Sequence, residues 1–155
     1  MEYPQARADD RKKGKPRTRR VGTVMSEHPD CALVRRCYEA FGQGDMEKLG
    51  SMMTADVIHH VPGNNPLSGH HKGREGVLDL YRRLGEETNG TFRVELGPVL
   101  VDGRGHVMSF HTVYADRGDR GIEIGEGLFF TIVGGKITDI DGCIADIDES
   151  DAFWS

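Results

Sequence analysis

The 155-residue chain has few cysteines and no long apolar run, and both absences narrow its class. Its three cysteines are Cys31, Cys37 and Cys143, and none forms a C-x-x-C pair with another. An odd number at these spacings argues against a disulfide framework or a structural zinc site, so we expect small buried apolar residues. No stretch approaches the roughly 20 apolar residues that cross a bilayer, and no signal-peptide core is recognisable. We therefore expect a soluble, cytoplasmic protein without a membrane partner.

Basic residues are concentrated at the N-terminus. Residues 1–24 hold eight Lys or Arg and three Asp or Glu, which gives +5. The whole chain carries −5, so residues 25–155 carry −10. Residues 1–25 have almost no apolar content, which predicts a disordered basic tail before a single domain at 28–155. That tail could be a nucleic-acid-binding arm or have no function, but the acidic body makes nucleic acid an unlikely partner.

Three amphipathic helices are predicted in the first half of the domain. The first covers residues 30–45 and takes Asp30 as its N-cap, and the second covers 46–54 and follows Asp45 as its N-cap. The third covers 73–88, where apolar residues recur at i, i+3, i+4 and i+7. These residues are Val77, Leu80, Tyr81 and Leu84.

Period-2 patterns dominate the second half. Strands are predicted at 55–62, 91–102, 106–117, 121–133 and 136–148. Gly97-Pro98 predicts a bulge or a sheet edge, and Gly134-Gly135 predicts a hairpin. The segment with His70 and His71, before the third helix, reads as a polar loop. Three helices followed by antiparallel strands indicate an α+β domain with helices on one face of a curved sheet.

Four short motifs together resemble the SnoaL-like proteins, which belong to the superfamily of nuclear transport factor 2 and ketosteroid isomerase. They are F-x-x-G-D at 41–45, H-V-P-G-x-x-P-L-S-G-x-x-x-G at 60–73, G-G-K-I at 134–137 and the closing F-W-S. The resemblance covers about residues 28–155. It implies the cone-shaped NTF2-like fold, in which three N-terminal helices pack on a strongly curved, mixed and mainly antiparallel sheet. It also implies an apolar pocket and a homodimer formed through the sheet.

The histidines of the first strand are the leading candidates for a catalytic base. Neighbours on a strand face opposite sides, so either Ile58 and His60 face the pocket, or Val57, His59 and Val61 do. The pattern alone does not choose. The resemblance favours His60, because the ketosteroid isomerases place a catalytic aspartate just before the equivalent turn. With an ordinary pKa of about 6.5, histidine is suited to accept a proton at neutral pH.

The resemblance also implies groups that would stabilise an enolate. The ketosteroid isomerases carry an oxyanion-hole tyrosine on the first helix, which points to Tyr38. Their second donor is an aspartic acid, whose place here falls near Leu128, with Glu126 two residues away on the same strand face. We expect the other substrate-contacting residues to be Phe41, Ile58, Tyr81, Phe110, His111, Leu128, Phe130 and Ile140.

The sequence therefore predicts a small-molecule enzyme of the SnoaL-like class, such as an isomerase or cyclase. His60 would remove a proton next to a carbonyl of an apolar ligand, and Tyr38 or Glu126 would stabilise the enolate. We expect no cofactor and no metal, since no spacing such as H-E-x-x-H is present. The alternative is a non-catalytic module that binds a small ligand, because a fold does not determine a reaction.

Overall fold

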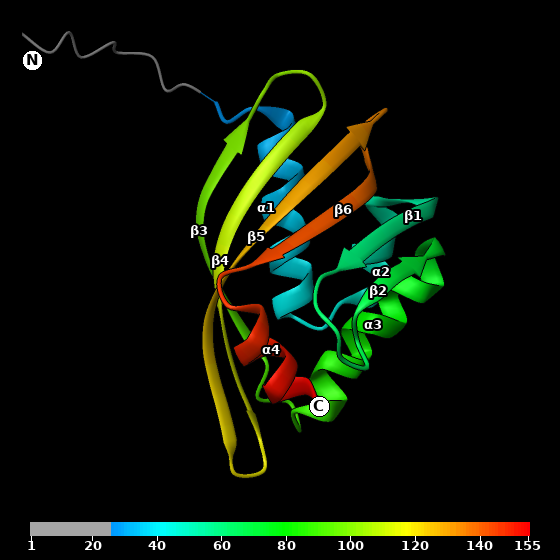
Figure 1. Ribbon diagram of the computed structural model, residues 1–155. Coiled ribbons are helices and arrows are strands. Elements are labelled where there is room, and N and C mark those ends of the chain that lie inside the picture. Colours follow the sequence, from blue (N-terminus) through cyan, green and yellow to red (C-terminus); the bar gives the residue numbers. More distant parts are fainter. Residues whose placement is uncertain (1–25) are drawn as a thin grey trace, which may run out of the picture.

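The computed structural model describes residues 26–155, and the basic tail at 1–25 lies outside this range. Helices and strands follow in an α+β order (Figure 1). The elements are α1 (Pro29–Gly42), α2 (Met46–Ser51), β1 (Met53–Val61), β2 (Gly69–Lys72), α3 (Gly73–Glu87), β3 (Arg93–Val101), β4 (His106–Arg117), β5 (Arg120–Val133), β6 (Lys136–Ile144) and α4 (Ile147–Trp154).

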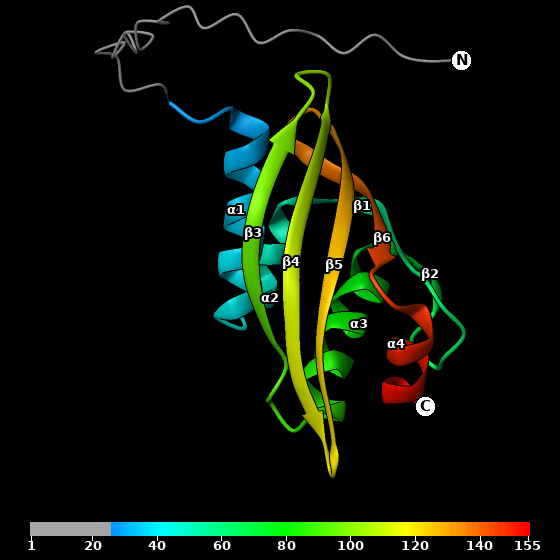
Figure 2. The ribbon, with the colours of Figure 1, turned by 60° about the vertical axis from the view of Figure 1, so that its left-hand side comes forward.

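All six strands form one sheet in the order β2-β1-β6-β5-β4-β3. The pairing of β1 with β6 is parallel, and the other pairings are antiparallel. The sheet bends so that α1 and α3 lie against one face, while no helix or strand within residues 26–155 covers the opposite face of β3, β4 and β5 (Figure 2). This arrangement confirms the predicted α+β class with a curved, mixed and mainly antiparallel sheet. No helix in residues 26–155 is long and apolar enough to cross a membrane.

The predicted N-cap is correct for α2 and wrong for α1. Asp45 caps α2 as predicted, since its side chain accepts a hydrogen bond from the Lys48 amide at 3.0 Å. Asp30 does not cap α1, because that helix starts earlier, with Pro29 in its first turn. The cap is His28, whose Nδ1 accepts from the Asp30 amide at 3.1 Å.

Gly97-Pro98 interrupts the pairing of an edge strand, as predicted. The register of β3 on β4 shifts between Leu96 and Val99, and β3 is an edge strand of the sheet. A proline lacks the N–H that a central strand would need, so an edge accommodates it.

The segment at 69–72 was expected to be a loop, and that prediction is wrong. It is the short strand β2, which pairs with β1 so that His59 lies opposite His71 and His60 opposite His70. A four-residue polar edge strand has no apolar alternation of its own, so periodicity could not identify it.

The chain also ends differently from the prediction, because the last strand stops at Ile144 and α4 follows. Asp146 accepts a hydrogen bond from the Glu149 amide at 3.0 Å and so caps α4. This helix is tied to the turn after β1: Asp151 accepts from the Asn64 amide and from Asn65 Nδ2, both at 2.8 Å. Gly63 in that turn has a φ of 98°, and a Cβ there would strike the Asp151 carboxylate.

Two buried clusters fill the inner side of the sheet. One joins α1, α2 and α3 to the sheet, and the other lies beneath α4 and includes Phe153 and Trp154. The half-buried Tyr81 packs against both clusters. Of the cysteines, Cys31 and Cys37 are buried as predicted. Cys143 is exposed, because alternation along β6 turns it away from the core.

Replacing Asp151 with alanine should lower the free energy of unfolding by about 2 kcal/mol. Each hydrogen bond to a charged group contributes roughly 1.5–3 kcal/mol, and the partial exposure of Asp151 reduces the sum of the two. Urea unfolding followed by circular dichroism measures the change. The control is Asp148→Ala on the exposed side of the same helix, which should change stability by less than about 0.5 kcal/mol. Equal losses in the two variants would contradict the role of Asp151.

Candidate active site

A cavity of about 130 Å³ lies between the two buried clusters and is lined mostly by apolar and aromatic side chains. Eight of the eleven residues predicted for the site line it. They are Tyr38, Phe41, Tyr81, His111, Glu126, Leu128, Phe130 and Ile140. Wall residues outside the predicted set include Cys37, Asn65, Phe92, Ser150, Trp154 and His59, the alternative to His60 on the first strand. The remaining three predicted residues, Ile58, His60 and Phe110, do not line the cavity.

The expected orientation of β1 is wrong, because His59 and not His60 faces the cavity. His59 lies opposite Ile140 of β6, which is buried on the inner face, whereas His60 lies opposite the exposed Asp141. The ring of His60 packs on the outer side against that of His70, with ring centroids 4.7 Å apart. Residues directly opposite one another in a sheet share a face, so this register turns Ile58 outward with His60.

A signal for this orientation was present in the sequence. Val57 and Val61 flank His59 at two-residue spacing, whereas the other face of the strand carries the charged Asp56. Val57 is fully buried and Asp56 is exposed.

Phe110 was also expected at the pocket and lies on the outer face instead. Its side chain is beside Gly127, and the residue is 42% exposed. On β4 the inward positions are those of Ser109 and His111, both buried. The apolar Met108 and Phe110 therefore face outward, while the polar Ser109 and His111 face inward, which is the reverse of the usual pattern and explains why the sequence was misread.

A chain of hydrogen bonds runs from the core to the cavity wall. The hydroxyl of Tyr38, on α1, lies 2.7 Å from Ser109 Oγ and 2.6 Å from His111 Nδ1. The other ring nitrogen of His111, Nε2, lies 3.0 Å from Glu126 Oε2 on β5. Two neighbouring strands and a helix therefore hold the Glu126 side chain in one orientation.

The direction of each hydrogen bond in this chain follows when Glu126 is a carboxylate and the His111 ring is neutral. A carboxylate can only accept, so His111 Nε2 carries a hydrogen and donates it to Glu126. Nδ1 of the neutral ring then accepts from the Tyr38 hydroxyl, and Ser109 donates to the Tyr38 oxygen. Burial raises the pKa of Tyr38, so the phenol keeps the proton that this scheme requires.

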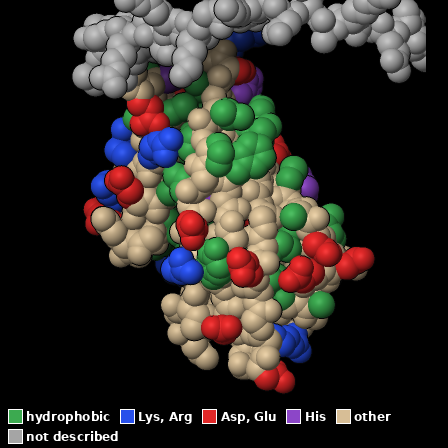
Figure 3. All heavy atoms as spheres, turned by 90° about the vertical axis from the view of Figure 1, so that its left-hand side faces the viewer, with side chains coloured by type: hydrophobic (Ala, Val, Ile, Leu, Met, Phe, Trp, Pro, Cys, Tyr) green, Lys and Arg blue, Asp and Glu red, His purple; other side chains and the backbone are tan. Residues whose placement is uncertain are grey.

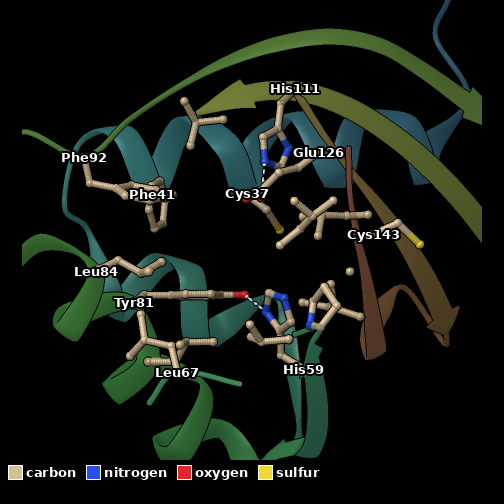
Figure 4. A pocket seen from close by; sticks show the side chains of 18 of the residues that line it. Cys37, Phe41, His59, Leu67, Tyr81, Leu84, Phe92, His111, Glu126 and Cys143 are labelled. Carbon is tan, nitrogen blue, oxygen red and sulfur yellow. Dashed lines mark hydrogen bonds and ion pairs between the residues drawn. The ribbon is translucent and has the colours of Figure 1, made fainter. Parts of the chain in front are cut away.

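A second polar pair lies on the other side of the cavity (Figure 4). His59 Nδ1, on β1, is 2.9 Å from the hydroxyl of Tyr81 on α3. Burial lowers the pKa of His59 to about 3, and His71, His60 and His111 add to the effect. His59 is therefore neutral at physiological pH.

The tautomer of His59 follows from its partner. Burial raises the pKa of Tyr81 well above its ordinary value, so this phenol also keeps its proton. Within residues 26–155 the Tyr81 hydroxyl has no other acceptor than His59 Nδ1. An unpaired buried donor is costly, so Tyr81 donates to Nδ1 and the hydrogen of the neutral ring lies on Nε2.

Two polar atoms of these networks are left free toward the cavity. Glu126 Oε1 and His59 Nε2 have no hydrogen-bond partner among the described residues. They belong to side chains that face one another across the cavity (Figure 4). A hydrogen-bond acceptor that can bind a proton and an uncharged donor are thus presented to the same small space.

The charge of the wall limits what the cavity can hold. Among the lining residues within 26–155, Glu126 is the one charged side chain, and none is Lys or Arg. Among the described residues, no three His, Cys, Asp or Glu side chains are grouped to hold a metal ion. Burial raises the pKa of Cys37 to about 12, which keeps its thiol protonated and a poor nucleophile. The other polar groups of the wall include its histidines and tyrosines, Glu126, Ser150 and Asn65, whose side chain already binds Asp151.

Comparisons with known proteins agree with this architecture. The sequence profile described as "SnoaL-like domain" matches residues 34–140. The uncharacterized protein Rv0034 of Mycobacterium tuberculosis is 30% identical over 131 residues, which cover 84% of this chain and 100% of that protein. The structure of Bal32a, from a soil-derived mobile gene cassette, has 34% identity and a TM-score of 0.80, and covers 82% of this chain and 97% of its own. A Xanthomonas campestris protein of unknown function with a cystatin-like fold has 28% identity and a TM-score of 0.76, with 81% and 98% covered.

Acidification should destabilise the protein partly through His59. Its pKa is about 3 in the folded state against 6.5 ordinarily, so its contribution is complete above about pH 6.5 and declines as the pH falls toward 3. The slope approaches about 1.4 kcal/mol per pH unit for one such group. Urea unfolding of wild type and His59→Gln between about pH 7 and pH 5 should show a shallower slope in the variant.

The neighbouring substitution His60→Gln is the matched control for this experiment. It leaves His59 in place on the inner face, so the slope due to His59 should persist. An identical pH dependence of wild type and His59→Gln would contradict the buried neutral state of His59.

Proposed function

Because the chain belongs to the SnoaL-like domain family, we propose that it is an enzyme that moves a proton at the carbon beside a carbonyl group of a small, uncharged, mostly apolar molecule. The observation that carries the proposal is the pair of free atoms in one apolar cavity, Glu126 Oε1 and His59 Nε2. Enolisation requires a base at the carbon and a hydrogen-bond donor at the oxygen of the same molecule.

Glu126 is the proposed base. Its side chain is 22% exposed and reaches the cavity, and His111 binds one carboxylate oxygen. The second oxygen is then free to take the proton from carbon. In this scheme Tyr38 does not touch the substrate: it holds His111, and His111 orients Glu126.

His59 is the proposed donor to the substrate oxygen. Because it is neutral, its Nε2–H can donate a hydrogen bond to the developing enolate without giving up a proton. Tyr81 keeps the ring in the required tautomer and orientation. His60 has no part in this scheme, since it lies on the outer face.

The proposed reaction balances without a further reactant. Glu126 takes the proton as the C–H bond breaks, and the electron pair moves to the carbonyl oxygen to form the enolate. An isomerisation is completed when Glu126 returns the proton to a different carbon. In a cyclisation the enolate carbon attacks a second carbonyl of the same molecule, the π electrons of that carbonyl move to its oxygen, and Glu126 returns the proton to this oxygen. Only a proton and the electrons of the substrate move, so the proposal invokes no cofactor.

The test is exchange of hydrogen for deuterium next to the carbonyl of cyclohexanone and cyclohexenone in D₂O, followed by proton NMR. Wild type should accelerate the exchange, and Glu126→Gln should reduce this acceleration at least about 100-fold, because general base catalysis contributes roughly 10²–10⁴. His60→Gln should exchange like wild type.

Other results would change the proposal in defined ways. Equal exchange by wild type and Glu126→Gln would reject Glu126 as the base. Ketones that shift the amide resonances of the cavity wall without any exchange would instead identify a binding module.

We also propose that the protein forms a homodimer through the outer face of its sheet. Three apolar residues form a row across β3, β4 and β5 on this face: Leu100 lies opposite Met108, and Met108 lies opposite Phe129. They are 55%, 40% and 37% exposed, and Phe110 lies nearby on the same face. Figure 3 shows hydrophobic side chains gathered on this side. A contiguous apolar patch of this kind favours association, and a second copy of the chain offers the same patch by symmetry.

A charge placed in this row should produce monomers. Phe129→Glu is expected to reduce the mass measured by light scattering after gel filtration by half, because burying a carboxylate in an apolar interface is costly. The control is Ile147→Glu, which changes an exposed apolar residue on α4, outside the sheet face. A wild type that is already monomeric would reject the proposed dimer.

A further inference from the structure

The hydroxyl of Ser150 is an unpaired polar group on the cavity wall. Ser150 lies on α4, is only 3% exposed and lines the same cavity as Glu126 and His59. Its backbone amide donates to the Asp146 carbonyl at 3.2 Å, as expected within a helix. Its side-chain oxygen has no hydrogen-bond partner among the described residues.

The other buried polar residues are all paired. Five polar residues are buried in the described part of the chain, and the side chains of the other four make hydrogen bonds. Thr88 shows the usual solution for a hydroxyl on a helix, since it donates to the carbonyl four residues earlier at 2.7 Å. Ser150 has the same option and does not use it. Among the described residues, the fully enclosed side-chain atom without a hydrogen-bond partner is Arg74 Nε, so the Ser150 oxygen keeps a small accessible surface. Because Ser150 lines the cavity, a ligand there can pair with this hydroxyl.

Helix α4 holds this hydroxyl in place. Asp151, the next residue, binds the turn after β1 through Asn64 and Asn65. Arg117 donates to the Phe153 carbonyl at 2.7 Å, which fixes the end of the helix to β4. The hydroxyl is therefore presented from a rigid wall, as a preorganised binding group should be.

We propose that Ser150 is a specificity-determining residue, which forms a hydrogen bond with a second oxygen of the substrate, apart from the carbonyl at which Glu126 and His59 act. This inference rests on the proposed function. A serine hydroxyl can donate or accept, so it fits a hydroxyl or a second carbonyl of the substrate. The described part of the chain offers no Lys or Arg on this wall to an acid group, so the second oxygen belongs to an uncharged group.

The size of the cavity further restricts the class of possible substrates. A volume of about 130 Å³ is close to that of an apolar cavity that holds one benzene ring, about 150 Å³. The enclosed part of the substrate is therefore on the order of a single ring. The substrate should therefore have a carbonyl for Glu126 and His59, a second uncharged oxygen for Ser150, and a single ring. A hydroxy-ketone or a diketone built on one ring meets these three conditions.

The test compares cyclohexanone with its hydroxy derivatives at each ring position, titrated into ¹⁵N-labelled protein at millimolar concentrations. At least one hydroxy derivative should bind wild type about two- to tenfold more tightly than cyclohexanone, as one net hydrogen bond provides. Ser150→Ala should remove this advantage while cyclohexanone binds as before. Ser51→Ala, an exposed helical serine away from the cavity, should keep it.

A measurement on wild type alone guards against misfolding of the variant. The preferred hydroxy derivative should shift the amide resonances of α4 more than cyclohexanone does. Ser150→Ala should also unfold at the same urea concentration as wild type or a higher one, since it removes an unpaired hydroxyl.

The outcomes separate this inference from the function on which it rests. A hydroxyl advantage that is absent in wild type, or that survives in Ser150→Ala, would overturn the role of Ser150 and leave the exchange chemistry of Glu126 intact. Glu126→Gln should lose exchange but keep the hydroxyl advantage. If none of the ketones binds, both the substrate class and the role of Ser150 are rejected.

Discussion

A polar side chain on the inner face of this sheet must find a partner, because the same face forms the core of the protein. His111 and His59 meet this requirement in parallel ways. Each projects inward from a strand and binds a tyrosine from a helix, Tyr38 on α1 and Tyr81 on α3. These bonds fix the two helices relative to the sheet, and they leave one nitrogen of His59 and one oxygen of Glu126 free for a ligand.

The cavity depends on how the ends of the chain close over the sheet. The parallel pairing of β1 with β6 places His59 on the inner face opposite Ile140. The chain then turns from the end of β6 into α4, whose Ser150 and Trp154 form part of the wall. One strand pairing and one terminal helix therefore bring together groups that are about 90 residues apart in the sequence. Such long-range contacts specify the site more than any single element does.

The sequence predicted α1, α3 and the long strands because each has its own periodicity over nine or more residues. It predicted the short helix α2 from its N-cap, Asp45. The prediction from sequence failed for features that depend on contacts between distant parts of the chain. Period 2 divides β1 into two faces but does not say which face is inward, so His60 was chosen instead of His59. The helix α4 had a local signal, Asp146 with Glu149 three residues later, but the apolar alternation of β6 concealed it. The pairing of Tyr38 with His111, 73 positions apart, leaves no pattern in a single sequence.

The distribution of charge explains why a neutral histidine suits the wall opposite a carboxylate. In the proposed reaction the negative charge is on Glu126 before proton transfer and on the enolate oxygen after it, so the cavity would hold one negative charge throughout. A protonated histidine or a lysine would stabilise the carboxylate as well as the enolate, and would thereby weaken the base. A neutral His59 avoids this, since its N–H makes its strongest hydrogen bond only when charge develops on the substrate oxygen. Burial, which lowers the pKa of His59, is therefore the property that would make this wall a selective partner for the proposed enolate.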